Sequence, residues 1–330
     1  MKKILFVLGI MLCLVGCSTT ESNVIEELEN KINNLDSYNM TATLEIYRNE
    51  DKYTYDVDSS YSKSDLYKVT LVNKNNNHEQ IILKNDDGVY VLTPSLNKSF
   101  KFQSEWPYNN SQIYLLQPIV TDLSNDKNAK IENTNNGYTI TSKVNYTNEK
   151  DFVNQKVYLD KDKNIKSIEV LDSNGAVRMK LTITNIDYEP SFDKDYFEAT
   201  KYIKEDTTSE NDIEEKTTAK IEDVVYPLYI PTDTYLSNQD KVSTANGERV
   251  ILTFSGEEPF TVIQETLNNL DMVNYIYGDP YLILDTVGSI TDSSVSWISN
   301  GVEYSVISDS MPVSEIITVA QSITVEASVK

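Results

Sequence analysis

The sequence predicts an α+β protein built mainly from antiparallel strands, and three observations support this fold class. The chain has 22 tyrosines and only 10 glycines in 330 residues, and aromatic and β-branched residues favour strands. Apolar and polar residues alternate from Met40 to Tyr47, which is the period of a strand with one buried face. Short turn sequences, such as Asn-Asn-Gly at 135–137, separate these stretches, so consecutive strands are expected to pair antiparallel.

A helix is expected from Ser22, which can cap its first backbone N–H groups, to about Asp36. Its apolar residues recur at helical spacing and form one stripe: Val24, Ile25, Leu28, Ile32 and Leu35. The strand that follows offers the apolar face that this stripe needs. Further strands of this region are expected at 53–57, 67–72, 80–84 and 89–93, the last two joined by the turn 85–88.

A second helix is expected to begin at Asn110 or Ser111. The apolar residues at helical spacing are Ile113, Leu116, Ile119, Val120 and Leu123. Pro118 is expected to kink or split this helix, because proline removes a backbone donor and clashes with the preceding turn. Two helices beside a long antiparallel sheet predict a curved sheet with the helices on its concave side.

A linker is expected at 201–223, where the residues are polar and charged and show neither the helical nor the strand periodicity of apolar residues. Beyond it, strands are expected at 224–230, 249–255, 281–286, 295–299 and 302–307. Ser314 is expected to cap a last helix, whose apolar residues are Ile316, Ile317, Val319, Ala320 and Ile323. Residues 224–330 are therefore predicted to form a small α+β domain.

The first residues predict export and a lipid anchor. Lys2 and Lys3 precede an apolar run that is shorter than the ~20 residues of a membrane-spanning helix. The Leu-Val-Gly-Cys sequence that ends at Cys17 resembles the lipobox of bacterial lipoproteins, in which the cysteine carries a diacylglyceryl group. The resemblance implies a signal peptide at 1–16, lipidation of Cys17 and a tether at 17–21, on the extracytoplasmic face of the cell membrane. An ordinary secretory signal is the alternative.

Charge and cysteine content narrow the classes of partner and of chemistry. A net charge of −22 disfavours binding to nucleic acid, which carries the same sign. Cys13 would leave with the signal peptide and Cys17 would carry lipid, so the mature chain has no thiol for a disulfide, for catalysis or for a metal.

Candidate catalytic chemistry is sparse. His78 is the one histidine and lies in a polar turn, so neither a Ser-His-Asp triad nor a zinc cluster is expected. Residues 160–164 match the first half of an EF-hand loop, but Ile165 and Leu171 stand where that loop needs glycine and glutamate. We predict no catalytic residue, no metal site, no cofactor and no enzymatic activity. A hydrolase that uses paired carboxylates is an alternative, because acidic residues are abundant.

Tyrosines recur along the expected strands, at Tyr47, Tyr53, Tyr55, Tyr61, Tyr67 and Tyr90. Ordinary cross-strand packing is the favoured interpretation. The alternative is a semi-polar lining for an amphiphile, whose buried acyl chain would gain about 0.8 kcal/mol per methylene. The sequence does not indicate which residues would bind a ligand.

Two stretches resemble envelope lipoproteins that have a LolA-like fold. They are residues 106–116 and a group made of 156–160, 168–170, 181–188, 192–193 and 196–197. That group of proteins includes the YdcC-type and GerS-type sporulation and germination lipoproteins and, more distantly, LolA, LolB and RseB. The resemblance covers about 22–200 and implies an antiparallel half-barrel wrapped around helices. Trp297 with 300–304 and 311–323 resembles a small domain of Gram-positive lipoproteins that has no assigned chemistry.

This resemblance implies a membrane-tethered, non-enzymatic envelope lipoprotein that binds a protein partner or an amphiphile in sporulation, germination or envelope homeostasis. GerS implies a peptidoglycan amidase as the partner, and LolA implies lipid or the acyl chains of a lipoprotein. An RseB-like sensor that regulates an anti-sigma factor is a further alternative. A carrier requires a continuous apolar hollow. A module that binds a protein partner requires an apolar edge strand or an apolar convex patch. A hydrolase requires two carboxylates in one cleft.

Overall fold

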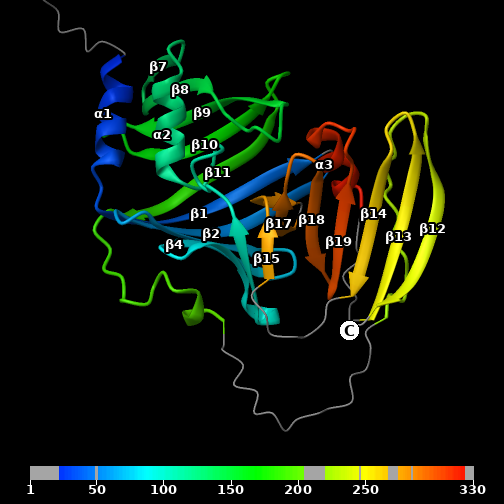
Figure 1. Cartoon of the computed structure of the whole chain (residues 1–330). Helices are drawn as coiled ribbons and strands as arrows, with labels where there is room; N and C mark the ends of the chain where they lie inside the picture. Colours follow the sequence, from blue (N-terminus) through cyan, green and yellow to red (C-terminus); the bar gives the residue numbers. More distant parts are fainter. Residues whose placement is uncertain are drawn as a thin grey trace, which may run out of the picture.

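The computed structural model describes residues 22–48, 51–203, 220–244, 247–266, 274–283 and 285–323. These residues form two sheets and three α-helices, so the described chain is mostly β with few helices (Figure 1). The signal peptide, the tether and Cys17 lie outside the described residues, as does 204–219 of the expected linker. No helix in the described ranges is long and apolar enough to cross a membrane.

The larger sheet has 12 strands. They are β1 (Ser37–Arg48), β2 (Asp51–Ser62), β3 (Leu66–Asn73), β4 (Glu79–Asn85), β5 (Gly88–Thr93), β6 (Lys98–Gln103), β7 (Lys130–Thr134), β8 (Gly137–Lys143), β9 (Phe152–Asp160), β10 (Ile165–Asp172), β11 (Val177–Asp187) and β15 (Asn274–Tyr277). Their order is β15-β6-β5-β4-β3-β2-β1-β11-β10-β9-β8-β7. Strands β1 to β11 pair antiparallel, whereas β15 lies parallel to β6.

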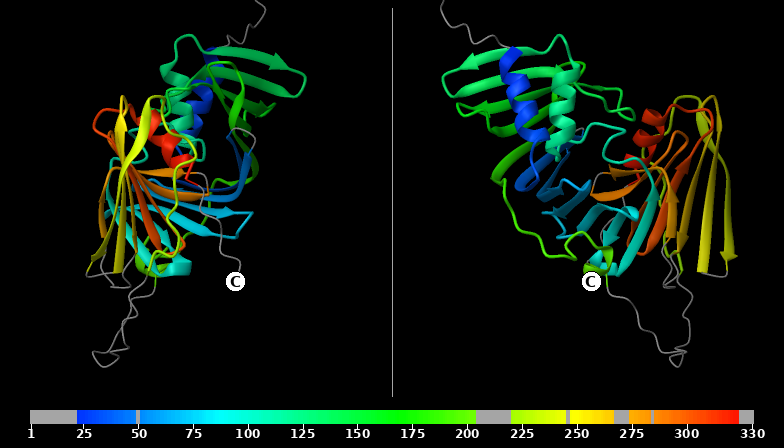
Figure 2. Two further views of the ribbon diagram at one scale, coloured as in Figure 1. Left: turned by 90° about the vertical axis from the view of Figure 1, so that its right-hand side faces the viewer. Right: turned by 60° about the vertical axis from the view of Figure 1, so that its left-hand side comes forward.

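The helices α1 (Ser22–Asn33) and α2 (Leu116–Asn125) lie side by side on one face of this sheet (Figure 2). Three residues of the expected stripe, Val24, Leu28 and Ile32, are buried in a core shared with α2 and the strands. Burial of each such side chain stabilises the fold by about 1.5–3 kcal/mol. Two short 3₁₀ helices, η1 (Pro94–Leu96) and η2 (Ala199–Lys201), connect elements of this region.

The expected start of the second helix is wrong. Helix α2 begins at Leu116, because the preceding residues are fixed to another part of the chain: the N–H of Ser111 donates to the carbonyl of Asn145 at 2.9 Å. Pro118 is the third residue of the helix and does not interrupt it. The first N–H groups of a helix have no acceptor within it, so a proline there removes no hydrogen bond.

The smaller sheet has seven antiparallel strands. They are β12 (Thr234–Thr244), β13 (Gly247–Gly256), β14 (Phe260–Thr266), β16 (Asp279–Ile283), β17 (Thr286–Ile290), β18 (Ser294–Ser299) and β19 (Val302–Ile307). Their order is β12-β13-β14-β19-β18-β17-β16. Helix α3 (Val313–Gln321) covers one face, and its Ile316, Val319 and Ala320 are buried with Val250 and Phe254 of β13.

Three expectations for this part of the chain are wrong. Residues 224–230 form no strand, because the backbone of Val225 bonds to a side chain, the amide of Gln264, at 3.0 and 2.6 Å. The expected strand 281–286 is split between β16 and β17, which pair with each other as a hairpin. Helix α3 begins at Val313, with Pro312 in the capping position and Ser314 inside the first turn.

The side chain of Gln80 in β4 joins the two sheets. It is buried, with 6% of its surface exposed. Its Nε2 donates to the carbonyl of Val287 in β17 at 3.2 Å, and its Oε1 accepts from the N–H of Val287 at 2.6 Å. Its Oε1 also accepts from the hydroxyl of Thr286 at 3.0 Å. The amide therefore pairs with the β17 backbone as a neighbouring strand would.

Other contacts between the sheets surround this pair. Strand β15, which follows β14 in the chain, adds to the larger sheet beside β6. Glu149 forms an ion pair with Arg48 and accepts a hydrogen bond from the hydroxyl of Tyr281 in β16. Ser104 donates to Asp279 at 2.5 Å. The sequence carried no signal for any of these contacts.

Replacing Gln80 by alanine tests its role. The substitution leaves the buried N–H and C=O of Val287 unpaired, and each such group costs about 1–3 kcal/mol. We expect Gln80→Ala to lose about 2–4 kcal/mol of unfolding free energy in urea titrations. The matched control is Gln103→Ala at the exposed last residue of β6, which should change stability by less than about 0.5 kcal/mol. Equal midpoints of urea unfolding for the two variants would contradict this role of Gln80.

Candidate functional site

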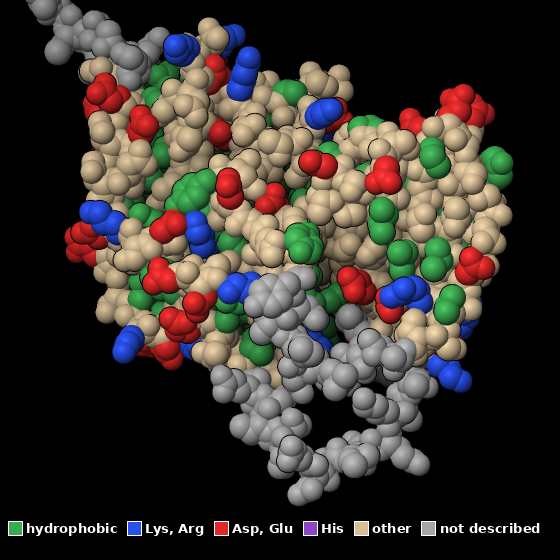
Figure 3. Space-filling model, viewed as in Figure 1, with side chains coloured by type: hydrophobic (Ala, Val, Ile, Leu, Met, Phe, Trp, Pro, Cys, Tyr) green, Lys and Arg blue, Asp and Glu red, His purple; other side chains and the backbone are tan. Residues whose placement is uncertain are grey.

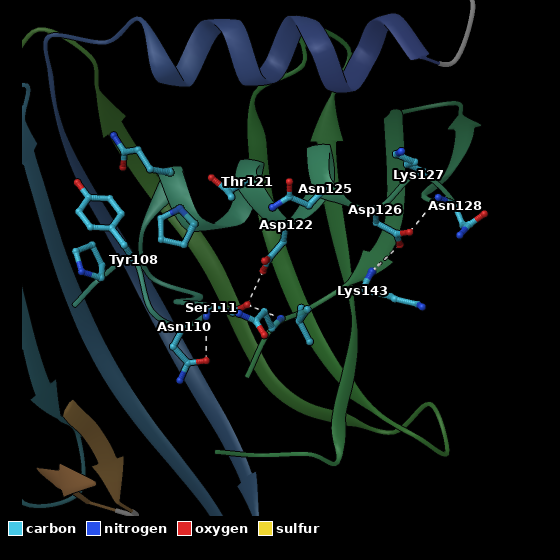
Figure 4. A pocket seen from close by; sticks show the side chains of 15 residues that line it. Tyr108, Asn110, Ser111, Thr121, Asp122, Asn125, Asp126, Lys127, Asn128 and Lys143 are labelled. Carbon is cyan, nitrogen blue, oxygen red and sulfur yellow. Dashed lines mark hydrogen bonds between the residues drawn. The ribbon is translucent and has the colours of Figure 1, made fainter. Parts of the chain in front are cut away.

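A cavity of about 560 Å³ opens beside α2, between that helix, the segment 107–111 and residues 143–145 (Figure 4). Most of the side chains that line it are polar. Tyr108, with 60% of its surface exposed, stands on one wall, and its hydroxyl donates to Asp65.

A serine and a carboxylate face each other in this cavity. The hydroxyl of Ser111 donates to Asp122 at 2.6 Å and accepts from the N–H of Asn145 at 2.7 Å. Burial raises the pKa of Asp122 to about 6, although the hydrogen bond from Ser111 acts in the opposite direction. No histidine lines the cavity. Without an imidazole to take its proton, Ser111 has the contacts of a residue that fastens α2 to the connection after β8.

A second carboxylate, that of Asp126 directly after the end of α2, lines the same cavity. Asp126 accepts from the N–H groups of Lys143 and Asn128, each at 2.9 Å, and these bonds hold the pKa of Asp126 below its usual value. A hydrolase that uses two carboxylates needs one with a raised pKa as the acid and one with a lowered pKa as the base. Here, however, both oxygens of Asp126 and one oxygen of Asp122 are already bonded to the protein.

Side chains fill the space between the larger sheet and its helices. Tyr38, Tyr67, Trp106 and Leu115 are each at most 1% exposed there. Tyr67 packs edge-on against the ring of Trp106, with 6.0 Å between the centroids. Among the described residues, this region therefore forms a packed core rather than the continuous apolar hollow that a carrier requires.

The strand tyrosines follow the same pattern. Tyr55 and Tyr67 are buried, and the other four, Tyr47, Tyr53, Tyr61 and Tyr90, are partly buried. The ring of Tyr61 lies between those of Tyr38 and Tyr67, at 5.6 and 5.0 Å between centroids. Cross-strand packing accounts for these contacts.

Within the ranges that the structure describes, no three His, Cys, Asp or Glu side chains gather into a group that could hold a metal. The half EF-hand is a turn: Asp160 accepts from the N–H groups of Asp162 and Asn164, each at 2.9 Å. His78 lies in another cavity, of about 280 Å³, between the two sheets. Burial lowers the pKa of His78 and so favours its neutral imidazole.

An exposed apolar surface lies at the edge of the smaller sheet, where β12 is the last strand. Tyr235, Leu236 and Val242 of β12 are 62%, 39% and 47% exposed. The adjacent segment 226–230 adds Leu228, which is 79% exposed, and the hydroxyl of Tyr226 donates to Gln239 of β12 at 2.7 Å. Hydrophobic side chains are visible over this part of the molecule at the right of Figure 3.

Strand β12 was not predicted from the sequence. Polar residues at 237–241 break its alternation, and a bulge between Leu236 and Asn238 shifts its register against β13. The signal that could have found it is a run with Tyr235 and Leu236 near its start and Val242 near its end.

The chain matches the family model described as "Sporulation protein YdcC-like" over residues 1–197. It is 34% identical over 319 residues to Sporulation protein YdcC of Bacillus subtilis (strain 168), covering 94% of this chain and 93% of that protein. The chain belongs to the YdcC-like sporulation protein family. This confirms the resemblance to YdcC-type proteins that the sequence indicated.

Solved structures show a weaker likeness. A chain of the Pseudomonas aeruginosa MucA/MucB complex is 13% identical, with a TM-score of 0.34, over 93% of this chain and 99% of that one. A chain of the complex between the Clostridioides difficile CwlD amidase and the GerS lipoprotein is 19% identical, with a TM-score of 0.32, over 52% and 97%. At these scores the likeness supports no inference about partners.

Substitution of the two cavity carboxylates should change stability in opposite directions. A carboxyl group whose pKa is raised in the folded state costs stability once the pH rises above its unfolded pKa of about 4. Wild-type protein should therefore lose about 2 kcal/mol relative to Asp122→Asn between pH 4 and pH 7. Asp126 has a lowered pKa, so Asp126→Asn should be less stable than wild type at pH 7, and the deficit should vanish in acid.

Urea titrations of the three proteins at pH 4, 5, 6 and 7 provide the measurement. Parallel pH profiles for wild type and Asp122→Asn would show that Asp122 is not buried as described.

Proposed function

We propose that this protein is a non-enzymatic binding protein of the sporulating cell envelope, which is tethered to the membrane by lipid on Cys17 and holds a partner protein at β12. In this proposal the larger sheet, with α1 and α2 on one face, is a LolA-like half-barrel that acts as a scaffold. The exposed apolar edge strand is the observation that carries the proposal.

An edge strand can bind an extended segment of another protein. The outer edge of β12 has no neighbouring strand among the described residues, so its backbone groups can pair with an added strand. Tyr235 and Val242 lie opposite Ser255 and Arg249, which puts both on the face of the sheet away from α3. They would contact alternate side chains of the added strand.

Two of the other edge strands, β7 and β16, are less suited to this role. Strand β7 is five residues long, polar and exposed. Strand β16 lies at the opposite edge of the smaller sheet, where its Tyr281 is bonded to Glu149 of the larger sheet. The length and apolar side chains of β12 therefore favour it as the docking edge.

The packed interior of the larger sheet and the net negative charge of the chain favour a protein partner over an acyl chain or a nucleic acid. The packed core around Trp106 speaks against carriage of acyl chains. A charge of −22 repels nucleic acid. A partner with a basic extended segment would be attracted over long range and would bind faster at low salt.

Lipidation of Cys17 is tested on the full-length chain. We expect radiolabelled palmitate to be incorporated and the protein to sediment with membranes, because two acyl chains hold a protein stably on a bilayer. Cys17→Ser should remove both, whereas Cys13→Ser should remove neither. Membrane association that persists in Cys17→Ser would contradict the tether.

Docking at β12 is tested by placing a photo-crosslinking amino acid at Tyr235 or Val242 in sporulating cells. Both positions should give the same adduct with one other protein, and the control position Glu132 in β7 should not. Tyr235→Asp should reduce the adduct formed from position 242 by about tenfold, without a loss of stability above about 0.5 kcal/mol. An adduct of twice the chain mass, or one formed equally from Glu132, would contradict the proposal.

A further inference from the structure

The cavity between the two sheets is lined by apolar side chains, by hydroxyl groups of serine and threonine, and by one acidic side chain. Apolar residues of both sheets line it, among them Val91, Phe100, Phe102 and Ile276 of the larger sheet and Val287, Trp297 and Ile298 of the smaller. Glu303 of β19 supplies its carboxylate, and no lysine or arginine is among the described residues that line it. The volume of about 280 Å³ lies just below the range typical of sites for drug-sized molecules.

The position of Glu303 is unfavourable for the stability of the sheet. It lies directly opposite Glu265 of β14, and like charges in directly opposed positions destabilise a sheet. Arg249, whose charge also acts on Glu303, forms an ion pair with Glu265, with 2.6 Å between Nη2 and Oε2. No described side chain forms an ion pair or a hydrogen bond with Glu303. Burial and the charge of Glu265 raise the pKa of Glu303, and the charge of Arg249 acts in the opposite direction.

The two sheets make this carboxylate part of a cavity. Tyr304 and Val306, the buried neighbours of Glu303 along β19, face α3, so Glu303 points to the opposite side. On that side Gln80 and Val287 hold the larger sheet in place, and Phe100 and Phe102 bring their rings to the cavity. His78 also lines the cavity, and burial lowers the pKa of its imidazole, which disfavours a positive charge there.

We propose that this cavity is a binding site for a small organic ammonium ion, with Glu303 as the counter-ion and the apolar side chains of the lining around the hydrocarbon part. The ammonium group donates hydrogen bonds to the Glu303 carboxylate and relieves its repulsion with Glu265. Aromatic rings near the cation add an attraction between the charge and the ring faces. The site is separate from β12 and does not depend on partner binding.

Two matched probes test the charge requirement. Phenethylammonium and 2-phenylethanol have the same hydrocarbon part, and only the first is charged at pH 7.5. Calorimetric titration of the protein should detect phenethylammonium binding, and 2-phenylethanol should bind at least about tenfold more weakly. The absence of phenethylammonium binding, or equal affinity for both probes, would overturn the proposal.

A matched pair of variants tests the residue. Glu303→Gln should weaken phenethylammonium binding by about tenfold or more and leave 2-phenylethanol unchanged, whereas Glu132→Gln on exposed β7 should alter neither. Glu303→Gln removes an unfavourable charge, so it should fold and melt at or above the wild-type temperature. Unchanged phenethylammonium affinity in a folded Glu303→Gln variant would overturn the assignment.

Discussion

The pairing of the Gln80 amide with the backbone of Val287 determines how the two halves of this protein are arranged. A side-chain amide carries one donor and one acceptor, so it can satisfy a backbone N–H and C=O together. Without it, the Val287 groups in buried β17 would lack partners, and the contact between the sheets would be unfavourable. The cavity beside Glu303 exists because the sheets are held at this point, and the docking of β16 leaves β12 as the open edge.

A second glutamine side chain pairs with backbone groups in the same way. Gln264 is fully buried in β14 and pairs with both backbone groups of Val225, in a segment that has no strand partner. This anchors 220–230 along the face that α3 also covers, with Ile221 buried in the same core. In both cases a buried glutamine takes the place of a strand, and a polar residue in the sequence gives no sign of it.

Local patterns in the sequence predicted the parts of the fold that depend on local contacts. The α1 stripe and the β4–β5 hairpin were predicted because helical spacing and the turn 85–88 are encoded within a few residues. The start of α2 was missed because it depends on the bond between Ser111 and Asn145. The pairing of β15 with β6 was missed because it joins segments more than 170 residues apart. Glu303 was not singled out because a chain with 51 acidic residues offers no reason to choose one.

The exchange of the Val287 amide proton is the most direct test of the central claim that the sheets form one cooperative unit. Native-state hydrogen exchange in low urea can follow it beside the amides of Leu44 and Val157, which lie in central strands of the larger sheet. The account predicts that the Val287 N–H exchanges only with global unfolding, with the same free energy and urea dependence as those two amides. Exchange of Val287 through a low-energy local opening, while Leu44 and Val157 stay protected, would contradict it.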